Sequence, residues 1–256
     1  MIGAVIGVAC VDMSAPSGPA SISKLQLPSP SVVIGDVMRD STGAPAKLSV
    51  IAYDANGARM TGVEAQFFVT DTGAPATLDA SGTLTGTRVG TVHVVGQIGA
   101  LQTPVEAIPV TVAPKLIARR SATADTLIAP LSTDSTQRGH DSAAVTVSGD
   151  SSLGAAGFIV KYALVYAPFT SSTSKSPAVF LADDQGNVSN VDTTDASGNA
   201  SRSVVVISAF LGDAELLAGH KVDSAVVTAQ ASYKGALISP SPIRIVIPIV
   251  VRLKLP

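Results

Sequence analysis

Four aspartates fall close together in the second half of the chain, in the stretch ADDQGNVSNVDTTDASGN, and they are the residues most able to share a ligand. They are Asp183, Asp184, Asp192 and Asp195. Calcium favours clustered carboxylate and carbonyl oxygens, and two neighbouring strands could bring Asp184 beside Asp195. The alternative is a pair of solvated hairpin loops built on Asp-x-x-Gly turns at residues 183–186 and 195–198. If the chain holds a metal ion, we predict calcium at these four aspartates, and no other cofactor is expected.

A second acidic loop, residues 54–57, lies between two apolar runs in SVIAYDANGARMTGVEAQFFV. It has one carboxylate, Asp54, before Gly57, and Glu64 falls inside the next predicted strand. A calcium loop needs acidic groups at several alternate positions. Asn and Asp hydrogen-bond their own backbone, and Asn-Gly readily adopts positive φ. We therefore predict a turn between strands at residues 54–57, without chemistry.

The histidines do not suggest a catalytic centre. His93 alternates out of an apolar strand in TVHVV, and His140 lies in a polar loop beside Asp141 and Ser142. Adjacent residues of one extended segment point in different directions, whereas a working triad is assembled from separated segments. The sequence also contains no G-x-S-x-G, P-loop, G-x-G-x-x-G or H-E-x-x-H motif. We predict that the protein is not an enzyme.

The composition favours an all-β protein. The chain has 256 residues, of which 46% are hydrophobic and 14% charged, with a net charge of -2. This balance offers no basic surface for nucleic acid. Val and Ile suit pleated strands, and Gly, Pro, Ser, Thr and Asp interrupt the apolar segments at short intervals. Aromatic residues are only 4% and Trp is absent, which weakens a carbohydrate-binding interpretation.

The single cysteine, Cys10, excludes an intrachain disulfide and a Cys-based zinc site. It follows the apolar stretch MIGAVIGVA and precedes the Ser/Pro/Gly-rich stretch VDMSAPSGPAS. This arrangement resembles the end of a bacterial lipoprotein signal peptide, in which the Cys becomes the lipidated N-terminus. Two features depart from that pattern: Gly7 stands where the motif prefers Leu, and no basic region precedes the apolar part. The alternative is a short buried strand; we predict lipidation of Cys10.

Alternating apolar segments between Gly, Asp and Pro clusters predict strands in two blocks. The first block has strands at residues 31–38, 46–54, 62–71, 87–99 and 106–114. The second block has strands at residues 142–150, 157–168, 177–187, 199–210, 223–235 and 242–253. Residues 115–125 show no clear period, and residues 211–220 are predicted as an insertion. Pro248 and nearby charges make the C-terminal run a strand rather than a membrane helix.

The two blocks resemble each other at an offset of about 95 residues, which is close to the length of one immunoglobulin-like sandwich. Asp54 matches Asp150, and Gly62 matches Gly157, with an apolar strand after each glycine. The flanking strands are retained while the loop changes. We predict two tandem immunoglobulin-like β-sandwiches; a single large sandwich or barrel is the alternative.

The motifs V-x-A-x-D-x-x-G, G-V-x-x-x-F-x-V and GTVHVVGQIG resemble the bacterial immunoglobulin-like (Big) domains of invasin/intimin-type adhesins and surface lipoproteins. In the second block VDTTDASGNASRSVVV and AVVTAQAS resemble later parts of the same pattern. The resemblance covers residues 25–114 and, more weakly, 125–251. It implies a structural, spacer or adhesive role at the cell surface and says nothing of a ligand.

Together these observations predict three parts: a signal-peptide remnant, lipid-anchor Cys10 and linker at residues 1–20, and sandwiches at residues 21–114 and 115–256. The function that follows is a non-catalytic exported module, at the outer membrane, cell surface or periplasm, which presents loops to an unidentified protein or cell-surface polymer. The membrane would be met only through the N-terminal lipid, and no nucleic acid is expected. The alternative is a carbohydrate- or calcium-binding sandwich.

Overall fold

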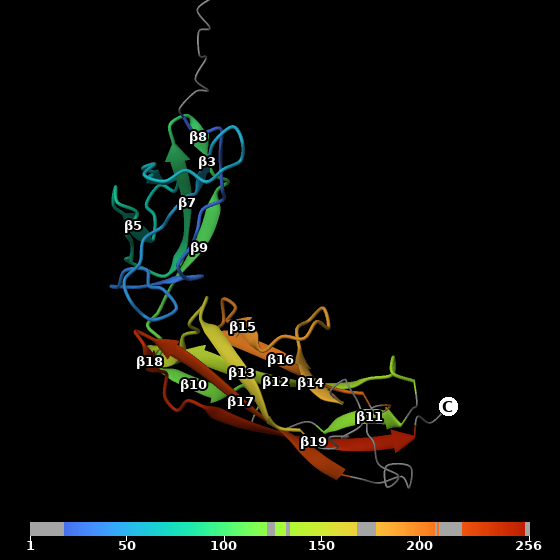
Figure 1. Cartoon of the computed structure of the whole chain (residues 1–256). Helices are drawn as coiled ribbons and strands as arrows, with labels where there is room; N and C mark the ends of the chain where they lie inside the picture. Colours follow the sequence, from blue (N-terminus) through green and yellow to red (C-terminus); the bar gives the residue numbers. More distant parts are fainter. Residues whose placement is uncertain are drawn as a thin grey trace, which may run out of the picture.

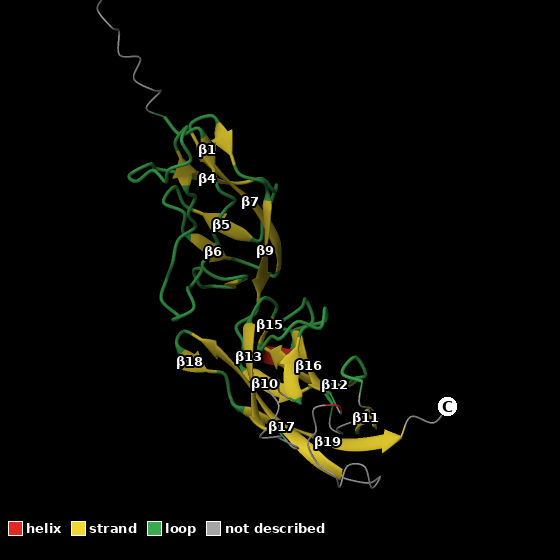
Figure 2. Cartoon of the chain, turned by 45° about the vertical axis from the view of Figure 1, so that its right-hand side comes forward, coloured by secondary structure: helices red, strands yellow, loops and turns green. Residues whose placement is uncertain are grey.

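The chain forms two β-sandwiches that follow each other end to end (Figure 1). The computed structural model describes residues 18–121, 126–131, 134–167, 178–207, 209 and 222–253. Within these residues the secondary structure consists of strands, the short 3-10 helix η1 (Asp150–Ser152) and a single 3-10 residue at position 209 (Figure 2). None of the described segments is a helix long and apolar enough to cross a membrane. Cys10 and the predicted insertion at residues 211–220 lie outside the described residues.

The C-terminal sandwich has the strand order of an immunoglobulin-like domain. Its strands are β10 (Leu116–Arg119), β11 (Leu127–Leu131), β12 (Gly139–Ser148), β13 (Ile159–Tyr166), β14 (Val179–Ala182), β15 (Val191–Thr193), β16 (Asn199–Val206), β17 (Val222–Tyr233), β18 (Ala236–Leu237) and β19 (Ile243–Leu253). One sheet has the order β10-β12-β16-β14, and the other has the order β11-β19-β17-β13-β15, with β18 beside β17. These orders match the two sheets of the immunoglobulin fold, with one additional strand at the β13 edge.

The N-terminal sandwich repeats this plan with shorter strands. They are β1 (Ser21–Ile22), β2 (Val32–Val33), β3 (Ala52–Tyr53), β4 (Gln66–Val69), β5 (Ala76–Leu78), β6 (Leu84–Gly86), β7 (Gly90–Ile98), β8 (Leu101–Gln102) and β9 (Glu106–Thr111). The main sheet has the order β2-β9-β7-β4, and the opposite layer consists of the pairs β1-β3 and β5-β6. Hydrogen bonds from Leu48 N to Gly82 O and from Met38 N to Leu84 O join this layer between its short strands.

Both sandwiches share one diagnostic pairing, because an early strand lies parallel to the last strand: β2 with β9, and β11 with β19. Each also has its own core, around Val92 and Ile108 in the first sandwich and around Val145 and Val227 in the second. The matched glycines of the repeat, Gly62 and Gly157, both have left-handed φ angles of 72° and 74°. The prediction of an all-β chain with two tandem immunoglobulin-like sandwiches is confirmed.

The structure departs from the predicted strands in several places. Residues 116–119 form β10, although the sequence there shows no clear period, and β11, β15 and the pair β5-β6 were not predicted. The strand predicted at residues 31–38 is limited to Val32–Val33, because the chain turns at Gly35. His140 lies in β12 and not in a loop, and it pairs with Val205 of β16.

Candidate functional site: the junction between the two sandwiches

Three of the four predicted metal ligands bind backbone groups. One carboxylate oxygen of Asp183 accepts hydrogen bonds from the backbone amides of Gln185 and Asn187. In Asp195 the equivalent oxygen accepts from the amides of Ser197 and Asn199. These are the Asp-x-x-Gly hairpin turns that the sequence offered as the alternative to a metal site, and Asp184 is exposed beside the first of them.

Asp192 is held by a cation of the protein. Its carboxylate lies 3.2 Å from a guanidinium nitrogen of Arg202 and accepts a 2.7 Å hydrogen bond from the amide of Ser201. Arg202 therefore already supplies positive charge where a metal ion would have to bind. Among the described residues, no three His, Cys, Asp or Glu side chains come close enough to hold a metal ion. Calcium binding by these aspartates stays a prediction for titration to test.

The loop at residues 54–57 is a turn, as predicted. The amides of Asn56 and Ala58 donate to the Asp54 carboxylate, and Gly57 has a φ of 78°. The same pattern occurs at four other Asp-x-x-Gly turns, which begin at Asp40, Asp79, Asp183 and Asp195. In each, the carboxylate bonds the second and fourth residues that follow. Together they form a recurring turn that reverses the chain and carries no assigned chemistry.

His93 has a partner that the sequence did not indicate. Its ring Nδ1 lies 2.9 Å from Asp71, and its backbone amide donates to the same carboxylate. The pKa of Asp71 is lowered mainly by the hydrogen bond from the backbone amide of His93, and further by the bond to the His93 ring. Because this contact fixes the loop after β4 against β7, we interpret it as a structural contact between neighbouring strands.

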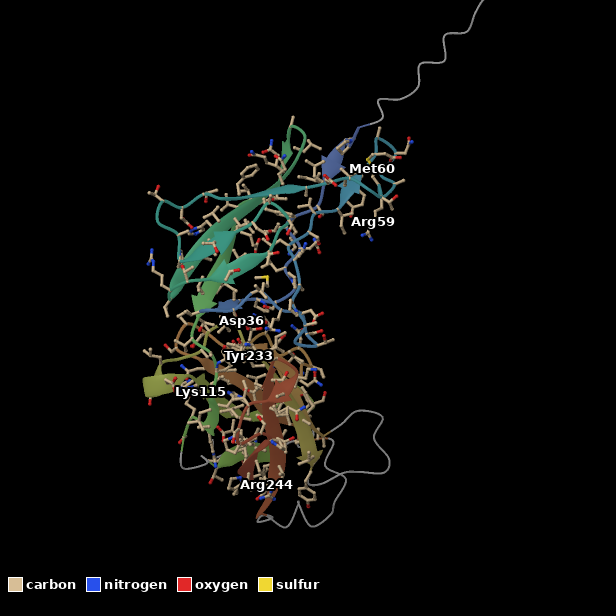
Figure 3. All side chains as sticks on the ribbon, turned by 90° about the vertical axis from the view of Figure 1, so that its left-hand side faces the viewer. Asp36, Arg59, Met60, Lys115, Tyr233 and Arg244 are labelled. Atoms are coloured by element: carbon tan, nitrogen blue, oxygen red, sulfur yellow. The ribbon has the colours of Figure 1, made fainter. Side chains whose placement is uncertain are left out.

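The most concentrated polar cluster lies where the two sandwiches meet, at Asp36 of the first. Its carboxylate accepts two hydrogen bonds of 2.8 Å from the Arg39 guanidinium and one from the amide of Val37. From the second sandwich, the hydroxyl of Tyr233 donates to the same carboxylate, and Lys234 Nζ lies 3.3 Å away. Figure 3 shows Asp36 and Tyr233 next to each other between the two bodies. One carboxylate thus joins groups from both sandwiches.

The electrostatics of this cluster keep Asp36 ionised. Burial by itself would raise the pKa of Asp36, but the hydrogen bonds from Arg39, Tyr233, Val37 and Lys234 outweigh it and hold the pKa well below its usual range. Burial and the neighbouring carboxylate raise the pKa of Tyr233, so its hydroxyl keeps the proton that it donates. The side chain of Asp36 is only 10% exposed, which limits screening by salt.

Two glycines allow the backbones of the sandwiches to come into direct contact. A Cβ added to Gly43 would lie 2.2 Å from the amide nitrogen of Gly235, and one added to Gly157 would lie 2.4 Å from the Cβ of Ser31. Real Cβ atoms are not found at such distances, so any larger residue would force the sandwiches apart. Glycine at these positions is therefore needed for close docking.

Further bonds and an apolar contact complete the junction. The hydroxyl of Ser31 donates to the carbonyl of Gly157 at 3.2 Å, and the amide of Ala156 donates to the hydroxyl of Thr111 at 2.8 Å. Val33, from β2 of the first sandwich, is buried in the core cluster of the second. The junction thus combines ionic, neutral and apolar contacts over several separate segments.

This site carries no signal in the sequence, because its partners are far apart along the chain. Asp36 and Tyr233 are 197 positions apart, and Ser31 and Gly157 are 126 positions apart. Neither pair belongs to a motif. Of these four residues, the sequence pattern indicates only Gly157, and it does so as a marker of the repeat and not as a contact.

Comparisons with known proteins leave the family open: no family model and no curated sequence matches the chain. Solved structures similar to it include the Yersinia pseudotuberculosis adhesin InvE, with 20% identity over 90% of this chain and 60% of that chain, and a TM-score of 0.34. Domains 4 and 5 of the S-layer protein SbsC match with 14% identity over 91% of this chain and 100% of that chain, and a TM-score of 0.32. The Escherichia coli adhesin FdeC matches with 12% identity over 90% of this chain and 65% of that chain, and a TM-score of 0.30. The chain thus spans less than two thirds of the InvE and FdeC structures. At these TM-scores the likeness carries no argument, so the fold assignment rests on the strand pairing.

Proposed function

We propose that this protein is a non-catalytic, exported module of the bacterial cell surface or periplasm, in which the two sandwiches act as one stiff spacer. The spacer would hold loops or a sheet edge at a fixed distance and direction for a protein or cell-surface polymer. The observation that carries the proposal is the junction at Asp36, where one carboxylate bonds groups of both sandwiches.

Stiffness follows from the physics of that junction. Tandem domains move relative to each other unless their interface holds them. Here the charged bonds of Asp36 are charge-assisted and partly shielded from salt, so they are stronger than ordinary surface pairs. At Gly43 and Gly157 the two sandwiches approach each other so closely that a side chain would not fit, which adds two close contacts to the junction. A spacer with this junction transmits orientation from one end to the other.

Anchoring through Cys10 would place the first sandwich next to the membrane and the second further out. The proposal here rests on the sequence around Cys10. Mass spectrometry of the N-terminus of the native protein tests it. We expect a lipid-modified Cys10 at the mature N-terminus, and a mature chain that begins with unmodified Met1 would contradict the anchor.

The spacer is tested by the distance distribution between the two sandwiches. Spin labels at Ala55→Cys and Ala196→Cys, in a Cys10→Ser background, put one probe on an exposed turn of each sandwich. Pulsed electron resonance on the unmutated junction should give a single narrow distance. Asp36→Asn and Tyr233→Phe should each broaden the distribution, because each removes part of the bonding between sandwiches. A distribution as broad in the parent as in these variants would contradict a stiff spacer.

Asp184→Asn is the matched control. It removes the same charge from an exposed turn of the second sandwich and should leave the distance distribution unchanged. Tyr233→Phe removes a single oxygen, so it keeps the experiment informative if Asp36→Asn fails to fold.

A further inference from the structure

A cavity opens at the junction, beside the Asp36 cluster. It is lined from the first sandwich by the segment from Pro28 to Val33 and the loop around Asp40, and from the second by the starts of β13 and β18 and the end of β17. Its volume is about 160 Å³. An engineered protein cavity of about 150 Å³ is known to take up benzene. The junction cavity is thus large enough for one ring-sized apolar group.

Part of the lining is apolar and comes from both sandwiches. Pro28 and Pro30 contribute from the first, and Phe158, Ile159 and Leu237 contribute from the second. Ile159 and Leu237 are 39% and 55% exposed, so apolar surface faces solvent here. An apolar group that entered the cavity would remove this surface from water, which favours binding.

The charges at the cavity are mainly positive. Arg39, Lys161 and Lys234 line it, against one carboxylate, Asp40. The Asp40 carboxylate is already occupied by the amides of Thr42 and Ala44 in its own turn. Asp36 neutralises part of Arg39 and Lys234. Lys161 is exposed and forms no ion pair with any described residue, so its charge is available to a ligand.

From these features we propose that the cavity binds a small organic carboxylate with a ring-sized apolar body. The apolar body would lie between the prolines of the first sandwich and the exposed Ile159 and Leu237 of the second. The carboxylate would pair with Lys161 at the rim. Charge complementarity selects an anion over a cation, and the volume selects a free small molecule over a folded partner.

The inference rests on the proposed function, because the cavity exists only while the sandwiches keep this arrangement. Ligand affinity should therefore depend on how firmly the two sandwiches are docked, since both of them line the cavity. If a variant is docked for only a fraction of the time, its apparent affinity for the ligand is reduced in proportion to that fraction. Distance measurements without ligand test the spacer, and ligand titration tests the cavity, so the two can fail separately.

The test is a titration of the full chain with benzoate, followed by amide NMR signals. We expect saturable shifts at Gly157, Gln230 and Gly235 at millimolar benzoate, and much smaller shifts with uncharged benzyl alcohol. Lys161→Met should weaken benzoate binding about fivefold, as for loss of one surface ion pair.

Lys47→Met is the matched control, since it removes an exposed lysine that does not line the cavity, and it should leave binding unchanged. Shifts that never saturate, or equal affinity in the parent and Lys161→Met, would overturn the proposal. So would a peptide with a free C-terminal Phe that binds more tightly than benzoate, because the preferred ligand would then be a polypeptide end.

Discussion

Two kinds of aspartate stabilise this protein by different means. In the Asp-x-x-Gly turns, each carboxylate is close to the surface and bonds amides within four positions of itself. At the junction, Asp36 is mostly buried and bonds the side chains of Arg39 and Tyr233, the second from the other sandwich. The first kind fixes a local bend, and the second fixes the arrangement of two domains.

This difference explains why removing one carboxylate should cost more stability than removing another. An exposed carboxylate exchanges bonds to water for bonds to amides, so its loss leaves nothing stranded. A buried carboxylate with charged partners leaves those partners without a counter-charge when it is removed.

The largest effect should come from Asp36→Ala. It leaves Arg39 and Lys234 beside each other without their shared carboxylate, and we expect a loss of about 3 kcal/mol of stability. Calorimetry should show the two sandwiches melting as separate transitions. Asp150→Ala, which removes the exposed 2.6 Å pair with Lys115, is the control and should cost no more than about 0.5 kcal/mol. Equal effects of the two substitutions would erase the contrast.

Gly43→Ala should cause the next largest loss of stability. Comparison with Gly57→Ala separates the part due to backbone strain from the part due to the clash between the sandwiches. Both glycines end an Asp-x-x-Gly turn with positive φ, at 89° and 78°. Around Gly57 no described atom lies within 4 Å of an added Cβ, whereas at Gly43 the added Cβ would lie 2.2 Å from Gly235. Each variant should lose about 1 kcal/mol to backbone strain. Gly43→Ala should lose about 1–2 kcal/mol more, measured by urea unfolding, because it also forces the sandwiches apart.

Tyr162→Phe should have a smaller effect, of opposite sign. Tyr162 is 2% exposed, and its hydroxyl has no hydrogen-bond partner among the described residues. Removing an unpartnered buried hydroxyl should raise stability by up to about 1 kcal/mol. Urea unfolding measures this change. A loss of stability would mean that the hydroxyl has a partner, such as an ordered water. Tyr233→Phe is the comparison, since its hydroxyl bonds Asp36 and its loss should destabilise.

The smallest effect should be the acid response of an exposed turn. Hydrogen bonds from Thr83 and then from Ser81 lower the pKa of the Asp79 carboxyl from its ordinary value of 3.8 to about 2. Because the folded pKa is the lower one, its stabilisation is complete above about pH 4 and is lost as the pH falls toward 2. Carboxyl NMR titration should show Asp79 ionised at pH 3. A midpoint near 4 would mean that the turn does not hold the carboxylate.

Local chemistry explains which parts of the molecule could be predicted from the sequence. The turn at residues 54–57 follows from Asp and Asn-Gly side by side, and the long strands β7, β12 and β17 follow from alternating apolar residues. The turns at Asp183 and Asp195 are also determined locally, because each carboxylate accepts hydrogen bonds from amides of its own turn. Their turns needed no information from the rest of the chain.

Features that depend on tertiary contacts could not be predicted. The strand β10 has only four residues, and it is stabilised by pairing with β12 along the register that joins Ile117 to Val147. Asp36 lies three residues before an arginine, which in sequence resembles many local ion pairs. Its role depends on Tyr233, which the fold brings from 197 positions away.

The central claim, that Asp36 and Tyr233 hold the two sandwiches together, is tested most directly by a double-mutant cycle. Asp36→Asn, Tyr233→Phe and the double variant are compared with the parent by urea unfolding of the intact chain. We predict that the two changes are not additive, with an interaction energy of about 1 kcal/mol or more. An interaction energy of zero would contradict the account, because the two residues would then act independently.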